Sequence, residues 1–146
     1  MMINVAFDAL NRYLMNSNSV ALQEMEWHLF SVIILLGLSY TLNQEGHVRV
    51  DILYTNFSAK KKAIINMVGV ITFVLPLSLL VAFGSLGFVE EAYIFMEQSG
   101  DPGGLPYRFI IKGLIPTSFF ILIFMSVGYF ARNYNLLKRL NSGSKS

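Results

Sequence analysis

Three polar clusters interrupt an otherwise apolar chain, and they contain the side chains that could take part in chemistry or binding. The first cluster combines two carboxylates, an indole and an imidazole in Glu24, Glu26, Trp27 and His28. Because Glu24 and His28 are four positions apart, they share one face of a helix and can pair. Two interpretations stay open. The cluster begins a helix at a membrane surface, where acids favour the helix dipole, or it contacts a partner subunit, since carboxylates beside hydrocarbon are costly unless satisfied.

The second cluster is the sequence Gly-His-Val-Arg-Val-Asp at residues 46–51. Its glycine can supply the left-handed residue that ends a helix. Beyond it, His47, Arg49 and Asp51 alternate with apolar residues, which in an extended segment places the polar side chains on one side. Residues 46–62 are therefore predicted to form an amphipathic arm on the inner membrane surface.

The third cluster covers residues 97–106 and contains two prolines and three glycines. This composition predicts a tightly turned, non-helical outer loop within residues 90–107. Pro106 suits the first turn of the following helix, and Lys112 lies one turn before Pro116, whose ring leaves the Lys112 carbonyl without its helical partner. The candidate site residues of this cluster are Glu97, Ser99, Gly104, Leu105, Pro106, Lys112 and Pro116.

None of these clusters has a pattern typical of catalysis. The sequence has no nucleophile elbow, phosphate-binding loop or zinc-binding histidine pair. It has no cysteine, which excludes disulfides, iron–sulfur clusters and thiolate zinc sites. A bis-histidine haem would need His28 and His47 at similar depth, but they flank one predicted span at opposite ends. We therefore expect no enzymatic activity, cofactor or metal, and the net charge of +2 is too small to suggest nucleic acid.

The elements between the clusters are long and apolar. Hydrophobic residues make up 54% of the chain and charged residues 14%, against about 25% in soluble domains. Residues 63–89 carry no charged side chain, and about 20 such residues already cross a bilayer. We predict an all-α integral membrane bundle, one membrane domain over residues 1–140 with full spans at about 25–44, 63–89 and 110–131. Residues 141–146 are predicted to be a disordered tail.

Lys and Arg are unevenly shared between the two sides of these spans. Eight lie on one side, in the first connection and the C-terminal tail: Arg49, Lys60, Lys61, Lys62, Arg132, Lys138, Arg139 and Lys145. Three lie on the other: Arg12, Arg108 and Lys112. Because basic loops stay in the cytoplasm, this asymmetry predicts a cytoplasmic C-terminus.

Two further features concern helix shape. Pro76 and Pro116 lie inside apolar runs and are expected to kink their helices. Residues 1–15 are too short to span; they place Ile3, Phe7 and other apolar residues on one helical face. This segment is either an interfacial helix or the end of a truncated spanning helix.

Taken in order, the clusters closely resemble the small permease subunit of tripartite ATP-independent periplasmic (TRAP) transporters. The similarity covers about residues 11–131 and includes Asn11-Arg12-Tyr13-Leu14, residues 22–30, residues 46–51, and residues 97–106 with Lys112 and Pro116. The family has a full membrane helix before the Asn-Arg-Tyr segment, whereas only residues 1–10 precede it here. Either this sequence starts too far downstream or the subunit is shortened.

The resemblance implies a bacterial inner-membrane uptake system for carboxylate-type solutes. In such a system a periplasmic solute-binding protein delivers the solute to a large permease subunit, and the small subunit stiffens the scaffold of the large one. Glu24, Glu26 and Trp27 are then expected to contact the partner or lipid, and residues 97–106 to shape the surface that meets the binding protein. The polar residues of the arm are expected to fix it in place.

Two rival functions are a self-sufficient homo-oligomeric channel or exporter and a haem-binding anchor of a redox complex. Against the channel, the predicted spans contain almost no ionisable groups that could form an ion path.

Overall fold

The computed structural model describes residues 1–15, 19–43 and 57–143, and all regular secondary structure in these ranges is helical. The elements are α1 (Met2–Met15), α2 (Val20–Asn43), α4 (Ala59–Gly69), the π-helical segment η1 (Val70–Val74), α5 (Leu75–Ile94) and α6 (Arg108–Gly143). Three continuous helices are long and apolar enough to cross a membrane: Val20–Leu42, Ala59–Ile94 and Arg108–Ser142. The predicted fold class, three full transmembrane helices with a short N-terminal helix, is confirmed.

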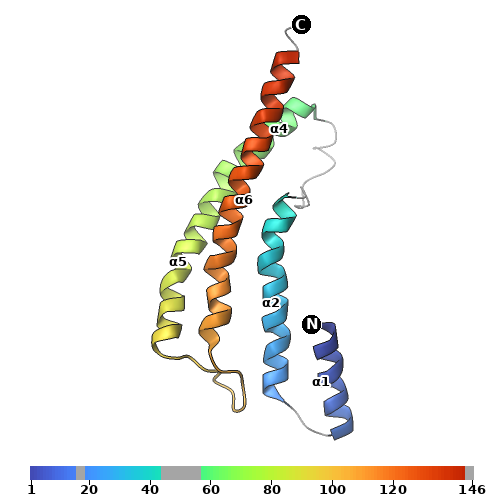
Figure 1. Cartoon of the computed structure of the whole chain (residues 1–146), viewed down its shortest axis with the longest axis vertical. Coiled ribbons are helices and arrows are strands. Elements are labelled where there is room, and N and C mark those ends of the chain that lie inside the picture. Colours follow the sequence, from blue (N-terminus) through green and yellow to red (C-terminus); the bar gives the residue numbers. More distant parts are fainter. Residues whose placement is uncertain (16–18, 44–56, 144–146) are drawn as a thin grey trace.

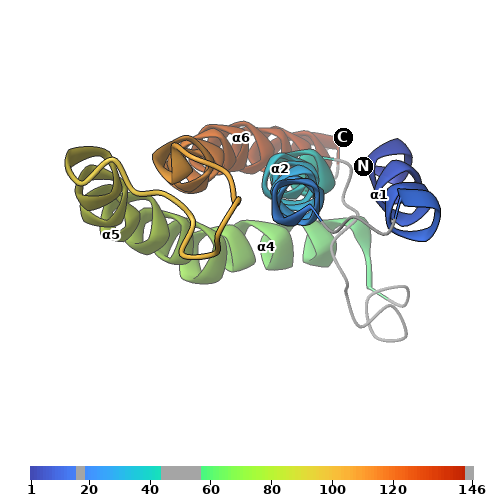
Figure 2. The ribbon, with the colours of Figure 1, turned by 90° about the horizontal axis from the view of Figure 1, so that it is seen from below.

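The helices lie side by side in the order α5, α6, α2 and α1 (Figure 1). The view from below shows α6 between α5 and α2, and α1 at the edge of the row (Figure 2). α4, η1 and α5 form one continuous helix that runs antiparallel to α6. We call the end of the molecule with the α5–α6 connection the loop end, and the end where α4 begins and α6 ends the tail end.

Several helix bounds lie outside the spans predicted from hydropathy. α6 continues through Gly143, so residues 141–143 of the predicted tail are helical. The arm predicted over residues 46–62 lies mostly outside the described residues, and residues 59–62 form the first turn of α4. Ser58 caps this turn, because its Oγ accepts a hydrogen bond from the Lys61 N–H at 3.5 Å.

The chain accommodates Pro76 through a widened helical turn. Proline has no N–H to donate, and its ring clashes with the carbonyl four residues earlier. In η1 the Leu75 N–H donates to the Val70 carbonyl, five residues back, so the turn contains one extra residue. Upstream and downstream of this turn the buried positions stay on the face toward α6, with Val70 followed by Ser78 eight positions later.

The interface of the α4–α5 helix with α6 is built mainly from small side chains. Small residues let helix backbones approach closely in a membrane, where the hydrophobic effect does not drive association. The buried positions are Ala63, Val70, Ser78, Ala82 and Ala92 on one side and Ser118, Leu122, Ser126, Tyr129 and Asn133 on the other.

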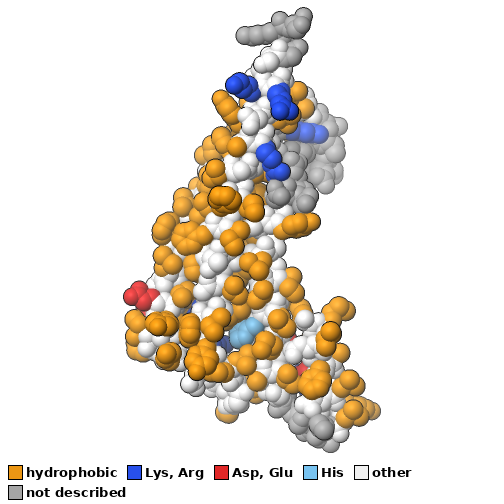
Figure 3. All heavy atoms as spheres, in the orientation of Figure 1, with side chains coloured by type: hydrophobic (Ala, Val, Ile, Leu, Met, Phe, Trp, Pro, Cys, Tyr) orange, Lys and Arg blue, Asp and Glu red, His pale blue; other side chains and the backbone are white. Residues whose placement is uncertain are grey.

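Polar side chains at this interface are satisfied within the bundle. The hydroxyls of Ser78, Ser118 and Ser126 each donate to the carbonyl four residues earlier at 2.6 Å. Asn66 Nδ2 donates to Asn133 Oδ1 across the α4–α6 contact at 3.1 Å. Large apolar side chains are exposed on the outside of the helices, and many of them lie along the face of the molecule shown in Figure 3.

α1 is amphipathic, as its sequence predicts. Its apolar residues Ile3 and Phe7 are exposed, whereas Asp8 is buried and ion-paired with Arg12 one turn later. Asn4 Nδ2 donates to the Leu22 carbonyl of α2 at 3.1 Å. α1 therefore turns its polar face toward α2 and its apolar face outward.

Candidate functional site

Glu24 lies one turn into α2 and is almost completely buried, with 4% of its surface exposed. The Ser99 hydroxyl donates to Glu24 Oε1, and the Leu105 backbone N–H donates to Oε2 at 2.6 Å. Arg108 Nη2 lies 4.0 Å from Oε1. One carboxylate of α2 therefore connects this helix with the loop and with the first residue of α6, which lie 75 or more positions later in the sequence.

The loop that surrounds this carboxylate, residues 95–107, follows directly from the end of α5. Met96 has a φ of 44°, and its N–H donates to the Tyr93 carbonyl at 3.1 Å, while the Glu97 N–H donates to the Ala92 carbonyl at 2.9 Å. This pair of bonds is a Schellman motif, which satisfies the last carbonyls of a helix and reverses the chain. α5 therefore ends with a fixed exit direction toward Glu24.

Backbone hydrogen bonds then close the loop on itself. The Ser99 N–H donates to the Leu105 carbonyl at 3.2 Å, the Gly104 N–H to Asp101 at 3.0 Å, and the Arg108 N–H to Glu97 at 3.0 Å. The bond between Ser99 and Leu105 joins the two residues that bind Glu24, and the bond between Arg108 and Glu97 closes the chain around them. The Ser99 hydroxyl and the Leu105 amide are therefore held in a preformed arrangement.

Position 104 requires glycine because the loop backbone there lies very close to Ser99 and to the Glu24 carboxylate. A Cβ there would overlap the Cβ and Oγ of Ser99 and would lie 2.9 Å from Glu24 Oε2. The backbone of the loop can approach the carboxylate only because this position has no side chain. Gly103 has a different role, since its φ of 82° lies in the left-handed region that glycine adopts without strain.

A second ion pair joins the loop to α6. Lys112 Nζ donates to Glu97 Oε2 and lies 3.8 Å from the centre of the Phe88 ring of α5. The ammonium thus makes an ion pair and a cation–π contact at once. Together with the Glu24 cluster (Glu24, Ser99, Leu105 and Arg108), this contact ties α2, α5 and α6 at the loop end.

The structure brings some candidate residues together and separates others. Glu26 faces α1, where it lines a recess with Asp8 and Arg12. Among the described residues His28 makes no hydrogen bond or ion pair with Glu24; its ring lies beside Trp27, with ring centroids 6.3 Å apart.

The prolines and the arm complete the set of candidates. Pro106 is exposed in the loop, two residues before α6 begins, and Pro116 is buried inside α6. His47, Arg49 and Asp51 lie outside the described residues.

Sequence analysis offered His28, four positions later, or a partner subunit as the partner of the Glu24 carboxylate, and it did not identify Ser99, Leu105 or Arg108. The structure places the hydrogen-bond partners in the same chain, 75 and 81 positions later. Glu24 itself therefore gives no reason to require a second subunit. Sequence analysis counted Arg108 only among the basic residues of the outer side. Arg108 lies four residues before Lys112 and so shares a helix face with it. This spacing could have indicated that both cations face the carboxylates at the loop end.

Comparison with known protein families agrees with this architecture. The family model described as "Tripartite ATP-independent periplasmic transporters, DctQ component" matches residues 1–136. Comparisons with curated proteins and with solved structures gave no significant match. Because the family match covers nearly the whole chain, this protein belongs to the DctQ-component family and is a small permease subunit of a TRAP transporter.

Proposed function

We propose that this subunit is a non-catalytic scaffold for the large permease subunit of a TRAP transporter that takes up carboxylate-type solutes. The observation that supports this role most directly is the double connection at the loop end. The Glu24 cluster and the Lys112–Glu97 pair fix three helices against one another through ion pairs and backbone hydrogen bonds. Such ties favour a rigid body over a moving element.

The large permease subunit is proposed to pack along the apolar side of the bundle. Phe73, Leu80 and Phe124 are each more than two-thirds exposed, so the helices offer long apolar surfaces that need lipid or protein against them. The solute-binding protein is proposed to meet the loop, whose tip at Gly100, Asp101 and Pro102 is exposed. The solute and ion sites then belong to the large subunit.

The proposed location is the bacterial inner membrane, with the C-terminus in the cytoplasm. Lys60 and Lys61 on α4, and Arg132, Lys138 and Arg139 on α6, belong to the tail end, where basic side chains gather in Figure 3. Basic residues beside a span favour the cytoplasmic side. The loop end, with Glu24 and Glu97, is then periplasmic, where a binding protein can reach it.

Co-purification tests the scaffold role. A tag on this subunit should recover a stable one-to-one complex with the large permease, and uptake in proteoliposomes should require both subunits and the binding protein. Solute transport by this chain alone would instead establish a channel or exporter, and a Soret absorption band in the purified chain would establish a haem anchor.

The arm is tested separately. We propose that His47, Arg49 and Asp51 fix the segment between α2 and α4 at the inner surface. Arg49→Ala should then weaken recovery of the large subunit while the affinity of the binding protein for its solute stays the same. Normal recovery with this variant would contradict the role of the arm.

A further inference from the structure

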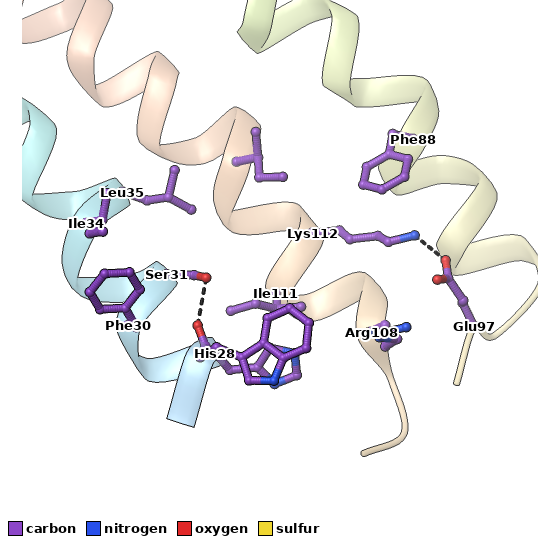
Figure 4. A pocket seen from close by; sticks show the side chains of 12 residues that line it. His28, Phe30, Ser31, Ile34, Leu35, Phe88, Glu97, Arg108, Ile111 and Lys112 are labelled. Atoms are coloured by element: carbon purple, nitrogen blue, oxygen red, sulfur yellow. Dashed lines mark hydrogen bonds and ion pairs between the residues drawn. The ribbon is translucent and has the colours of Figure 1, made fainter. Parts of the chain in front are cut away.

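A pocket of about 710 Å³ opens beside the Glu24 cluster, between α2 and α6 (Figure 4). Phe88 of α5 and Glu97 of the loop complete its wall. Its volume falls in the range of about 300–1,000 Å³ that is typical of small-molecule sites. Its walls belong to helices that cross the membrane, so its surroundings are lipid or a partner protein.

The pocket is polar at the loop end and apolar further in. Trp27, Arg108 and Lys112 line its outer part, whereas Ile34 and Ile115 line its inner part. Ile34 lies seven residues beyond Trp27, and Ile115 lies seven beyond Arg108, which is about 10 Å along each helix. An occupant that fits must therefore be charged at one end and apolar over about 10 Å.

The two cations of the pocket differ in what already surrounds them. Lys112 is engaged by the Glu97 carboxylate and by the Phe88 ring. Arg108 is held by one long ion pair, at 4.0 Å to Glu24, and 27% of its side chain is exposed. A guanidinium carries five N–H donors in a planar fork that matches the oxygens of a phosphate. Arg108 is therefore the side chain of the pocket to which an anionic head group would bind.

The tryptophan marks the depth at which this head would lie. Indole side chains gather at the level of lipid headgroups, because they are apolar with one polar edge. Trp27 and Arg108 line the same pocket, and His28 lies next to them. An anionic group at Arg108 is thus at headgroup depth, and the apolar part of the pocket runs toward the hydrocarbon.

We propose that this pocket binds one glycerophospholipid, with its phosphate at Arg108 and one acyl chain along Phe30, Ile34 and Ile115. A helix of the large subunit is the alternative occupant, but the combination of a phosphate-matching cation at headgroup depth and an apolar channel fits a lipid better. The proposal does not depend on the solute or on contact with the binding protein.

The single tryptophan of the chain provides the assay, because it lines the pocket. The probe is a phospholipid with brominated acyl chains, added to the full-length chain in detergent micelles. Bromine quenches indole fluorescence at short range. Quenching of Trp27 should saturate at one phospholipid per chain, and unlabelled phospholipid should reverse it.

Two variants and one control test the geometry. Arg108→Gln removes the charge and should weaken binding by at least about tenfold. Ser31→Phe fills the pocket and should abolish saturable quenching. Thr117→Phe is the matched control, since Thr117, like Ser31, is outside the core and bonds the carbonyl four residues earlier, but does not line the pocket. It should bind as the parent chain does.

Three results would overturn the proposal. The first is equal quenching by a brominated detergent that lacks a phosphate. The second is unchanged binding in both Arg108→Gln and Ser31→Phe. The third is exclusion of the phospholipid from the purified complex with the large subunit while the isolated chain binds it, because a protein segment would then occupy the pocket.

Discussion

Replacing Gly104 with alanine adds one methyl group at the closest approach between the loop and α2. The new Cβ would overlap two atoms of Ser99 and would crowd Glu24 Oε2 at 2.9 Å. One of the two Ser99 atoms is its Cβ, which rotation of the side chain cannot move away. Relief therefore requires the loop backbone to shift, and that shift pulls the Leu105 amide away from Glu24.

Overpacking of this kind costs about 1–3 kcal/mol in unfolding free energy. Unfolding of the full-length chain in detergent micelles by added dodecyl sulfate, followed by Trp27 fluorescence, measures it. Gly100→Ala is the matched control, because a Cβ at Gly100 meets nothing within 4 Å, and its effect should stay within about 0.5 kcal/mol. In the double variant, Ser99→Gly removes the two overlapping atoms and should recover part of the loss.

The reasoning is refuted if Gly104→Ala is as stable as Gly100→Ala. It is also refuted if Ser99→Gly and Gly104→Ala add independently, since a shared contact must appear as coupling in the double-mutant cycle.

Three further predictions concern the connections between helices. Asn133→Ala should lower the unfolding free energy by about 0.6 kcal/mol, the mean for hydrogen bonds between membrane helices. A double-mutant cycle with Asn66→Ala should show a coupling energy of the same size, and zero coupling would contradict this prediction. Glu24→Gln should raise the rate of protease cleavage in the loop roughly tenfold over Glu90→Gln, an exposed control, because an amide cannot replace both acceptor oxygens. Deletion of Thr72 removes the extra residue of the π turn while Pro76 remains, so it should lower the unfolding free energy by about 3 kcal/mol. Pro76→Ala in the same deletion variant removes the clash and should bring the unfolding free energy back to within about 1 kcal/mol of the parent chain. A single deletion in the middle of α5 should instead prevent folding, because it rotates one half of the helix by about 100°, and equal thermal melting of the two deletions would contradict this.

The sequence predicts the membrane class and the number of long helices because hydrocarbon imposes a strong and local requirement. A run such as residues 63–89, without a charge, leaves few alternatives to a spanning helix. The turned loop is equally local, since glycine and proline specify it one residue at a time. The involvement of Glu24 follows from its place beside hydrocarbon, where an unsatisfied carboxylate is costly.

The pairing of helices could not be predicted in the same way. Hydropathy is nearly uniform around α5 and α6, so it does not say which face of each helix is turned inward. The bond between Asn66 and Asn133 crosses 67 positions and depends on that rotation. The π turn was also missed: Pro76 indicates a disturbed helix, but a kink and a widened turn both relieve the clash.

The order in which the chain is made gives α6 a special position. α6 packs against α2 and against the α4–α5 helix and lies between them, and it is synthesised after both. Until residues 108–143 have entered the membrane, the earlier helices lack the surface that joins them, and Glu24 lacks Arg108. The contacts that join α2 to the α4–α5 helix therefore form only after α6 is inserted, and a chain interrupted before α6 leaves two apolar helices without a common neighbour.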